Sequence, residues 1–363
     1  MIIAAWIILI FTALQLCVVL TNAIFSQPLN VKSGRFQPLV SILIPARNEE
    51  KNIGLLLRDI QQQDYQNYEV LVFNDQSEDN TAELVKKLAH ADTRIKLIDS
   101  TGLPDGWLGK NYGCYRLAQK AKGDYLLFLD ADVRIAGNIF TSTLQKMQSY
   151  KLGLLSIFPK QKMGTWGEYV TVPNMTFILL SLLPLIFVRV LPFVSMAAAN
   201  GQFMLFNAQT YRKYQPHATF CNNKVEDIAI AQYLKQNKIK IACLQGNNNI
   251  ACHMYSSFSE AVNGFSKNVI MFFGNSAVLA VLFWLITTFG FIPVVFAMPK
   301  SLMLTYFIIF LSIRILVSLT SRQNAAKNVL LIIPQQISLG IFIVAAFRNK
   351  TKNTFTWKGR NIS

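Results

Sequence analysis

The sequence predicts an α/β domain with a parallel, doubly wound sheet, preceded by one membrane-spanning helix and followed by a membrane region. Three observations lead to this prediction. Short apolar strands alternate with helices from residue 39 onward, which is typical of a parallel sheet covered by helices. One strand, within residues 125–132, ends in two carboxylates one residue apart. Long uncharged stretches occur near both ends of the chain.

The composition indicates membrane segments. With 363 residues, 52% hydrophobic residues and 15% charged residues, the chain is too apolar for a soluble enzyme of this size. Residues 2–25 carry no charge, and as a helix they would span about 36 Å, against about 30 Å of hydrocarbon. This stretch has no charged start and no clear cleavage site. We therefore expect residues 1–25 to form an uncleaved transmembrane anchor.

The charges separate a domain from a membrane region. All 19 acidic residues lie between Glu49 and Glu260, whereas the last 87 residues contain nine Lys or Arg and no acid. We expect a domain over residues 38–276, after a polar linker, then a membrane region over 277–347 and a basic tail over 348–363. The net charge of +16 favours anionic partners such as membrane lipids and a nucleotide. Nucleic acid is not expected, because no basic stripe interleaves with stacking aromatics.

The topology in the membrane follows from the cysteines and the basic tail. The five cysteines have no metal-type spacing and are expected to be reduced, which favours a cytosolic domain in a multi-pass protein of the cell membrane. Three apolar stretches follow, at 277–298, 302–319 and 329–347. Three crossings would export the basic tail, against the positive-inside rule. We therefore expect residues 334–336, Pro-Gln-Gln, to break the last stretch into a re-entrant hairpin that keeps the tail cytosolic.

Within the domain, the expected elements alternate regularly up to residue 130. Strands are expected at 39–44, 68–73, 95–98 and 125–130, and helices at 52–62, 81–89 and 111–120. The apolar stretch 175–198 is interrupted by Pro184, Arg189 and Pro192. It predicts an interfacial or re-entrant segment lying against the bilayer, with a buried pair of helices as the alternative.

Asp130 and Asp132 follow the strand that begins at Tyr125. Ligands gather at the carboxyl ends of parallel strands, and side chains at i and i+2 of an extended segment point the same way. Both carboxylates could therefore face one hard cation, Mg²⁺ or Mn²⁺, together with the phosphates that it carries. The alternative is an ordinary Asp-rich turn at the end of a strand.

Two further loops leave neighbouring strand ends. Residues 45–50 read Pro-Ala-Arg-Asn-Glu-Glu, and residues 73–81 contain Asp75 in an acidic turn. Such carboxylates can accept hydrogen bonds from a nucleobase and a ribose, although a solvated turn has the same composition. Between them and Asp130, residues 103–113 bring Lys110 to the start of a helix, where it could hold a phosphate. An ordinary Gly-Trp turn is the alternative there.

Together these patterns resemble the nucleotide-sugar-binding half of family 2 glycosyltransferases, which have a GT-A, Rossmann-like fold. Asn74 and Gln76 stand where the family often has Asp and Gly. The stretch Gly-Trp-Leu-Gly-Lys ending at Lys110, and Trp-Lys-Gly-Arg at 357–360, are similar to those of the membrane enzymes that glycosylate carotenoid or hopanoid lipids. For donor binding, the resemblance and the loops point to the following residues: Pro45, Arg47, Glu49, Asp75, Lys110 and Asp130.

The resemblance also implies a catalytic carboxylate. The Glu226-Asp227 pair opens an amphipathic helix. Asp227 is the expected general base, and Glu226 is expected to position it or to raise its pKa. The alternative is that both acids only complement the helix dipole. By position, Gly201 and Gln202 are expected on the acceptor side, and Lys267 is expected to meet the leaving diphosphate. His217 and His253 lack a metal-type partner and are expected to be structural or at the surface.

The reaction implied by the resemblance is inverting, metal-dependent transfer of a single sugar from a nucleotide sugar, such as a UDP-sugar, to a carotenoid, hopanoid or other lipid acceptor. The Gln-x-x-Arg-Trp pattern of the family's processive synthases is absent from the sequence, which favours transfer of one sugar. Two alternatives remain open. The chain could transfer a sugar to a polyprenyl phosphate, or it could be a non-catalytic membrane protein that binds nucleotide sugars or serves in assembly.

Overall fold

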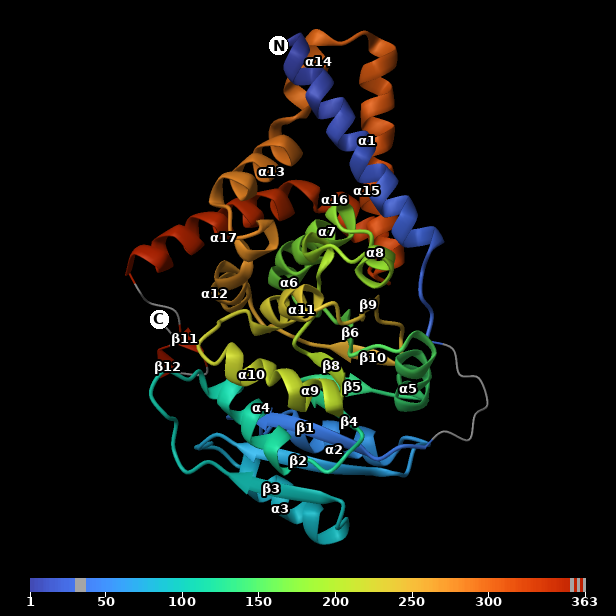
Figure 1. Cartoon of the computed structure of the whole chain (residues 1–363). Coiled ribbons are helices and arrows are strands. Elements are labelled where there is room, and N and C mark those ends of the chain that lie inside the picture. The colour runs from blue at the N-terminus through green and yellow to red at the C-terminus, as the bar shows by residue number, and fades with distance from the viewer. Residues whose placement is uncertain (30–36, 353–355, 358–359, 362–363) are drawn as a thin grey trace. The chain divides into compact units, whose positions relative to one another are not determined.

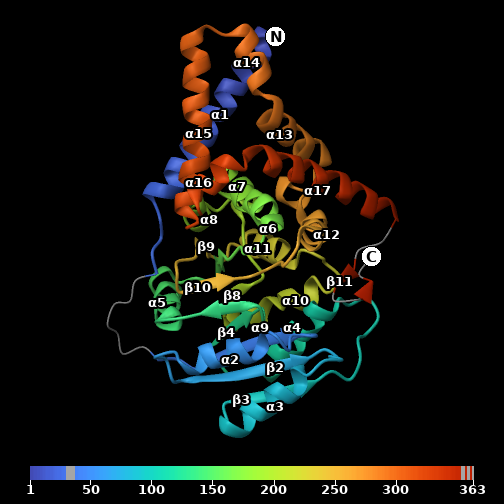
Figure 2. The same ribbon diagram turned by 180° about the vertical axis from the view of Figure 1, so that it is seen from behind.

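The chain forms two compact units in the computed structural model (Figures 1 and 2). The structure describes residues 1–29, 37–352, 356–357 and 360–361, with side chains up to Lys350. The α/β unit contains residues 27–160 and 185–253. The membrane-helix unit contains residues 1–26, 161–184 and 254–363. Each unit is described by itself below.

The α/β unit is built on a seven-stranded sheet in the order β3-β2-β1-β4-β8-β6-β9. All neighbouring strands pair in parallel except β8, which runs antiparallel to β4 and to β6. The sheet is therefore mixed, where the sequence predicted a parallel one. The strands of this sheet are β1 (Val40–Ala46), β2 (Tyr68–Asn74), β3 (Ile95–Asp99), β4 (Tyr125–Leu129), β6 (Leu154–Phe158), β8 (Phe203–Asn207) and β9 (Ile241–Gln245).

Helices and a small second sheet complete the unit. Strand β5 (Val133–Ile135) pairs antiparallel with β10 (Ile250–Cys252), and β7 (Lys160–Gln161) lies at the boundary between the units. The helices are α2 (Ile53–Gln61), α3 (Thr81–Ala91), α4 (Gly109–Lys120), α5 (Ile139–Tyr150), α8 (Leu185–Val190), η1 (Val194–Met196), α9 (Ala208–Tyr214), α10 (Pro216–Thr219) and α11 (Glu226–Gln236). The seven elements expected before residue 130 are present, with ends that differ by at most two residues.

Both faces of the central strands are buried. Ile42 and Ile44 on β1 pack in one hydrophobic core with Leu56 of α2. Side chains at alternate positions point to the opposite face, where the ring of Phe73 packs against Tyr112 of α4 with ring centroids 6.0 Å apart. Burial on both faces explains why these strands are continuous apolar runs. It also leaves the strand ends as the place where polar side chains can gather.

Among its described residues, the membrane-helix unit contains three helices long and apolar enough to cross a membrane: Ile2–Ile24, Lys300–Thr320 and Ile332–Lys350. A bent pair, Phe258–Phe273 with Ala277–Phe289, makes a further broken span or re-entrant loop. The helices of this unit are α1 (Ile2–Ile24), α6 (Trp166–Thr171), α7 (Pro173–Leu182), α12 (Phe258–Asn268), η2 (Met271–Phe273), α13 (Ala277–Phe289), α14 (Phe291–Ala297), α15 (Lys300–Thr320), α16 (Ala325–Leu330) and α17 (Ile332–Lys352).

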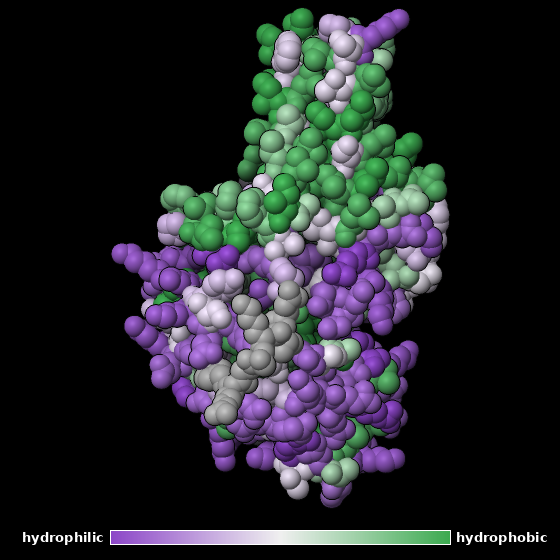
Figure 3. All heavy atoms as spheres, turned by 90° about the vertical axis from the view of Figure 1, so that its right-hand side faces the viewer, coloured by the Kyte–Doolittle hydropathy of each residue, from purple (hydrophilic) through white to green (hydrophobic). Residues whose placement is uncertain are grey.

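Polar side chains of α1 point into the membrane-helix unit. Asn22 donates from Nδ2 to the carbonyls of Leu180 and Leu183, both at 2.9 Å. These carbonyls lie at the end of α7, where helix carbonyls lack partners within the helix. Gln15 donates to Ser181 Oγ at 3.2 Å. Ala5, Ile8 and Leu9 of α1 pack in a hydrophobic cluster with Val294 and Tyr306. Other apolar side chains of α1 are exposed, and the surface of these helices is largely hydrophobic (Figure 3).

The prediction of a re-entrant hairpin broken at residues 334–336 is wrong. Helix α17 runs through Pro334, Gln335 and Gln336 without a break, and the interruption lies at Leu331. Pro334 falls in the first turn of α17, where a proline disrupts no hydrogen bond of the helix. The polar side chains are buried inside the unit, and Gln335 Nε2 donates to the carbonyl of Tyr169 at 3.0 Å.

The structure does not test the predictions for two other parts of the chain. Stretch 175–198 forms the two short helices α7 and α8 with the 3₁₀ turn η1, and its interfacial placement is untested. The linker and the basic tail 348–363 lie partly outside the described residues, as does the Trp-Lys-Gly-Arg stretch at 357–360. The backbones of β11 (Thr356–Trp357) and β12 (Arg360–Asn361) pair antiparallel.

A glycine near the start of β4 provides a test of sheet packing. A Cβ added at Gly123 would lie 2.6 Å from Ser41 N and 2.8 Å from the carbonyl oxygen of Tyr125. Since both contacts are with backbone, we expect Gly123→Ala to destabilise the unit by about 1–3 kcal/mol. At Gly54 an added Cβ meets nothing within 4 Å, so Gly54→Ala should instead stabilise it by about 0.5–1 kcal/mol. Thermal unfolding of the full chain in detergent measures both, and an unchanged Gly123→Ala would contradict the packing.

Candidate functional site

The site lies in the α/β unit at the carboxyl ends of β1, β2 and β4. Asp130 and Asp132 occupy the turn between β4 and β5, and the amide of Asp130 donates to the Gln202 carbonyl at 3.2 Å. Asp132 is mostly buried, and its Oδ1 has no hydrogen-bond partner among the residues that the structure describes. Burial, followed by the charges of Asp130 and Glu49, raises the pKa of Asp132 to about 7. A bound cation or a proton would therefore stabilise the Asp132 side chain.

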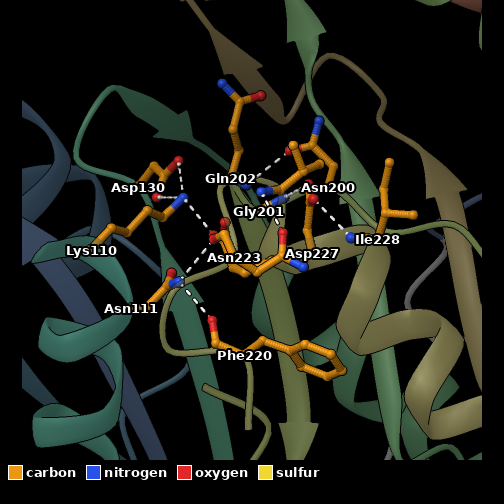
Figure 4. Close-up of polar contacts among 12 residues, drawn as sticks. Lys110, Asn111, Asp130, Asn200, Gly201, Gln202, Phe220, Asn223, Asp227 and Ile228 are labelled. Atoms are coloured by element: carbon orange, nitrogen blue, oxygen red, sulfur yellow. Dashed lines mark hydrogen bonds and ion pairs between the residues drawn. The ribbon is translucent and has the colours of Figure 1, made fainter. Parts of the chain in front are cut away.

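Lys110 joins the two halves of the site (Figure 4). Its Nζ lies 2.9 Å from Asp130 Oδ1 and 3.4 Å from Glu226 Oε1. Burial lowers the pKa of Lys110, but the charges of Asp130 and Glu226 more than offset this effect, and the pKa lies well above its ordinary value. Lys110 is therefore a fixed positive charge between a carboxylate that follows β4 and one that begins α11.

Asp227 is held by two backbone amides (Figure 4). Gly201 N donates to its Oδ2 at 2.9 Å, and Ile228 N donates to its Oδ1 at 2.8 Å. Burial and the charge of Glu226 raise the pKa of Asp227 to about 7, although Lys110 and the two amides act in the opposite direction. A carboxyl with a pKa near neutrality can accept a proton from a bound hydroxyl.

Gly201 lies between Lys110 and Asp227. A Cβ at this position would lie 3.1 Å from Lys110 Nζ and 3.7 Å from Asp227 Oδ2. The neighbouring Gln202 donates from Nε2 to Cys252 Sγ at 2.8 Å, and the Cys252 thiol hydrogen-bonds Asp132. Gly201 thus lies next to Asp227, the expected base, and Gln202 is linked to Asp132 through Cys252.

Asn111 is a positioning residue that the sequence did not reveal. Its Nδ2 donates to the carbonyls of Phe220, Cys221 and Asn223, at 2.9, 3.2 and 3.0 Å (Figure 4). These carbonyls belong to the loop that leads into Glu226 and Asp227. Asn111 follows Lys110 directly and is only 1% exposed. It therefore fixes α11 relative to Lys110.

Arg47 connects the two loops that are predicted to bind the nucleotide-sugar donor, residues 45–50 and 73–81. Its Nη1 donates to the carbonyls of Asp75 and Gln76 at 2.8 and 3.0 Å, and its Nη2 lies 3.3 Å from Glu78 Oε1. Asp75 is buried, and its amide donates to the Ala46 carbonyl at 2.9 Å. Arg47 thus shapes the loop around Asp75, and direct contact of either residue with a donor stays a prediction.

The remaining predicted residues lie in different places. Pro45 lies opposite Phe73 in the β1–β2 register. Glu49 N donates to Thr81 Oγ1 at 2.7 Å, and Glu49 Oε2 accepts from Asn52 at 2.9 Å. Lys267 belongs to α12 of the membrane-helix unit, so its predicted role is untested.

The surroundings of His217 agree with the structural or surface role expected from the sequence. His217 is buried, and burial lowers its pKa to about 3. Its Nδ1 lies 2.8 Å from Tyr211 Oη, in keeping with a structural role. Among the described residues, no group of three or more His, Cys, Asp and Glu side chains has the arrangement of a metal site.

The raised pKa of Asp227 has a consequence for stability. Below about pH 4 Asp227 is protonated in both the folded and the unfolded chain, whereas above pH 7 the folded chain must hold a buried charge. Stability from this group is therefore lost as the pH rises through about 7. We expect Asp227→Asn to be more stable than wild type at pH 8, with the difference vanishing toward pH 4. Thermal unfolding against pH measures this, with exposed Asp64→Asn as the control. A variant less stable than wild type at pH 8 would contradict the assignment.

Comparison with known proteins identifies the family. The family model "Glycosyl transferase family 2" matches residues 41–224. The 4,4'-diaponeurosporenoate glycosyltransferase of Staphylococcus haemolyticus (strain JCSC1435) is 25% identical over 248 residues, which are 66% of this chain and 63% of that protein. Its namesake in Staphylococcus aureus (strain USA300) is 28% identical over 276 residues, 72% of this chain and 69% of that protein. The chain thus spans less than two thirds of the length of the first of these relatives.

A solved structure shares the fold. The mannosyltransferase PcManGT from Pyrobaculum calidifontis, in complex with GDP-Man and Mn²⁺, superposes with a TM-score of 0.58 at 14% identity and covers 96% of this chain and 99% of its own. The predicted α/β class is confirmed, with helices at both ends that are apolar enough to span a membrane. On the family match, the chain belongs to glycosyl transferase family 2 and has its GT-A fold.

Proposed function

We propose that the chain transfers a single sugar from a nucleotide sugar to a membrane lipid, with inversion at the anomeric carbon and with the help of Mg²⁺ or Mn²⁺. One observation carries the proposal: Lys110 contacts both Asp130, on the expected donor side, and Glu226, next to the expected base. Residues predicted for donor binding and for catalysis, nearly a hundred positions apart, therefore share one cluster of charges.

The donor side suits a nucleoside diphosphate. Lys110 supplies a positive charge at the start of α4, and Asp75 lies in a loop at the end of the neighbouring strand β2. PcManGT, which shares the fold, was solved in complex with GDP-Man. A UDP-sugar is our expected donor for this chain. The carboxylates of Asp75 and Glu49 would accept hydrogen bonds from the base and the ribose.

Asp130 and Asp132 fit a divalent cation. The buried Oδ1 of Asp132, which lacks a partner among the described residues, is a ligand atom that a cation would satisfy. Two carboxylates are enough because Mg²⁺ usually takes one or two from the protein and completes its shell with substrate phosphates and water. When bound, such a cation neutralises the charge that grows on the departing diphosphate. Lys110 would stabilise the same charge from the protein side.

The base side suits an acceptor that loses a proton. Asp227 would take the proton from an acceptor hydroxyl, or from a carboxylic acid, as its oxygen attacks the anomeric carbon from the face opposite the leaving group. The amides of Gly201 and Ile228 hold the carboxylate in place. A single displacement of this kind inverts the configuration of the sugar.

A lipid acceptor is supported by the relatives and by the helices. The Staphylococcus proteins are named for 4,4'-diaponeurosporenoate, and the part of the chain that the structure describes has three helices suited to crossing a membrane. We propose a carotenoid, hopanoid or other lipid as the acceptor and a cytosolic active site. An acid-labile polyprenyl product from radiolabelled donor and membranes would instead identify a polyprenyl-phosphate transferase.

Metal dependence tests the donor side. Because Asp132 is a proposed metal ligand, we expect Asp132→Ala to lower kcat by about 10²–10³. Chelation with EDTA should stop the wild-type reaction, and Mn²⁺ or Mg²⁺ should restore it. The assay measures release of the nucleoside diphosphate from a set of nucleotide sugars, with lipid extract as acceptor. Asp64→Ala, at an exposed site, is the control. A non-catalytic protein would show no turnover, and an active Asp132→Ala would contradict the metal site.

Acceptor chemistry tests the base side. A hydroxyl acceptor needs a base, whereas a carboxylate acceptor is already ionised near neutral pH. We expect Asp227→Asn to lower kcat by about 10²–10⁴ on a hydroxyl acceptor and much less on a carboxylate. With the hydroxyl acceptor, the wild-type rate should rise with pH through about 7, the pKa of Asp227. Equal losses on both acceptors would assign Asp227 another role.

A further inference from the structure

An open groove in the membrane-helix unit lies between α6, α12 and α17, which pack against one another (Figure 1). Its volume is about 530 Å³, and pockets that bind small molecules usually measure about 300–1,000 Å³. Every described residue that lines the groove belongs to this unit. The groove is thus distinct from the charged site of the α/β unit and has room for a ligand of its own.

The walls of the groove are mostly apolar. Ile337 and Ile341 line it from α17, a candidate membrane span, and are 57% and 38% exposed. Trp166, which is 66% exposed, and Val170 line it from α6. Among the described lining residues, none carries a charge. The exposed side chains of a membrane span meet lipid chains, which are as apolar as leucine. Hydrocarbon is therefore the occupant that matches these walls.

Hydroxyl groups gather at the part of the groove where α6 and α12 begin. Thr165 Oγ1 donates to the carbonyl of Ser256 at 3.5 Å, and Ser257 is the N-cap of α12. The two acids of this unit lie beside them. Glu168 Oε2 accepts from the amide of Thr165 at 2.6 Å. Glu260 Oε2 accepts from the hydroxyl of Ser256 at 2.8 Å. An anionic headgroup would meet like charge here, whereas an uncharged hydroxyl could form hydrogen bonds.

Close packing and hydrogen bonds fix the walls of the groove. A Cβ added at Gly167 of α6 would lie 2.6 Å from Phe258 N, so α6 and the start of α12 approach at a distance that requires glycine. Ser338 Oγ of α17 donates to the carbonyl of Val170 and accepts from Asn174 Nδ2 at 2.8 Å. Because the walls are already ordered, binding of a lipid chain requires little further ordering of the protein.

The sequence connects the hydroxyl part of the groove with the strands next to Asp132. Ser256 follows Cys252, the last residue of β10, by four residues, and Thr165 follows Gln161, the last residue of β7, by four residues. Strands β5, β10 and β7 are neighbours in one sheet. Strand β5 begins directly after Asp132, and the Cys252 thiol hydrogen-bonds Asp132. This connection favours a substrate of the candidate site, rather than bulk membrane lipid, as the occupant of the groove.

We propose that the groove binds the hydrocarbon chain of the lipid acceptor, and that it favours an acceptor with an uncharged hydroxyl end over an anionic one. The inference rests on the proposed sugar transfer and names where the chain of the acceptor is held. Trp166, Ile337 and Ile341 would contact the chain, and the hydroxyl end would leave the groove past Thr165 and Ser256.

Photolabelling of the full chain in detergent, without a nucleotide sugar, tests the groove. The probe is hexadecanol with a diazirine in its chain, and mass spectrometry maps the labelled peptides. We expect label on residues 165–170 and 334–341 that an excess of plain hexadecanol displaces. Ile337→Trp, which fills part of the groove, should weaken this displaceable labelling about tenfold. Val344→Trp is the matched control and should not change it, because Val344 is on the same helix and 58% exposed but is not among the lining residues.

Two competitors test the chemistry of the occupant. Hexadecanoic acid, ionised in alkaline buffer, should displace the probe about tenfold less well than hexadecanol, because its charge meets the two acids. Equal displacement by the acid would overturn the preference for a hydroxyl end. Dioleoylphosphatidylcholine that displaces the probe as well as hexadecanol does would identify bulk lipid as the occupant and overturn the acceptor assignment.

Sugar transfer separates this inference from the proposed function. Ile337→Trp should raise about tenfold the concentration of lipid extract that gives half-maximal release of the nucleoside diphosphate, and Val344→Trp should not change it. Displaceable label in a wild-type chain that transfers no sugar would overturn the acceptor assignment together with the proposed function. Ile341→Trp is a second filling variant, and thermal unfolding checks that both variants fold. Transfer by wild type with no displaceable label in the groove, or label that survives in both filling variants, would overturn the groove alone.

Discussion

The ion cluster around Lys110 is the interaction on which the site depends. Asp130 and Glu226 come from distant parts of the chain, and both carboxylates approach the same Nζ. Removing one member of such a partly buried cluster leaves a charge without compensation, which costs far more than the cluster contributes. Burial raises the pKa of Asp227, and the same charges adjust it, since Glu226 raises it further and Lys110 lowers it. These opposing effects together give Asp227 a pKa that suits a general base at neutral pH.

The site residues that could be predicted from the sequence are those that a local pattern marks. Asp130 and Asp132 follow an apolar strand, and Glu226 with Asp227 opens a helix, so strand ends and helix starts could be read directly. The roles of Asn111 and Cys252 could not be read in this way. Asn111 acts through carbonyls about 110 positions away, and Cys252 acts on Asp132 from β10. Neither contact leaves a periodic or spaced pattern in the sequence.

In the fold, too, the features that depend on contacts between distant residues could not be predicted from the sequence. Strand β8 is a short apolar run, and such a run carries no sign of its direction, so the antiparallel insertion between β4 and β6 was not foreseen. The substitutions at 74 and 76 become understandable only with distant contacts in view. Gln76 has a φ of 53°, a conformation that favours glycine, and its carbonyl is held by Arg47. Asn74 donates to Asp99 at 2.8 Å, where an aspartate would meet a like charge.

The two units handle buried charge in different ways. In the α/β unit, Lys110 and Arg134 are paired with carboxylates of the same unit, so the chain itself sets the electrostatics of the site. In the membrane-helix unit, both acids are already used at helix starts, and Arg314 keeps two donors without partners among the described residues. Its guanidinium lies instead over the ring of Phe177, 3.6 Å from the ring centroid. The buried cation of the membrane-helix unit is thus stabilised by an aromatic ring, whereas the cations of the α/β unit are stabilised by carboxylates.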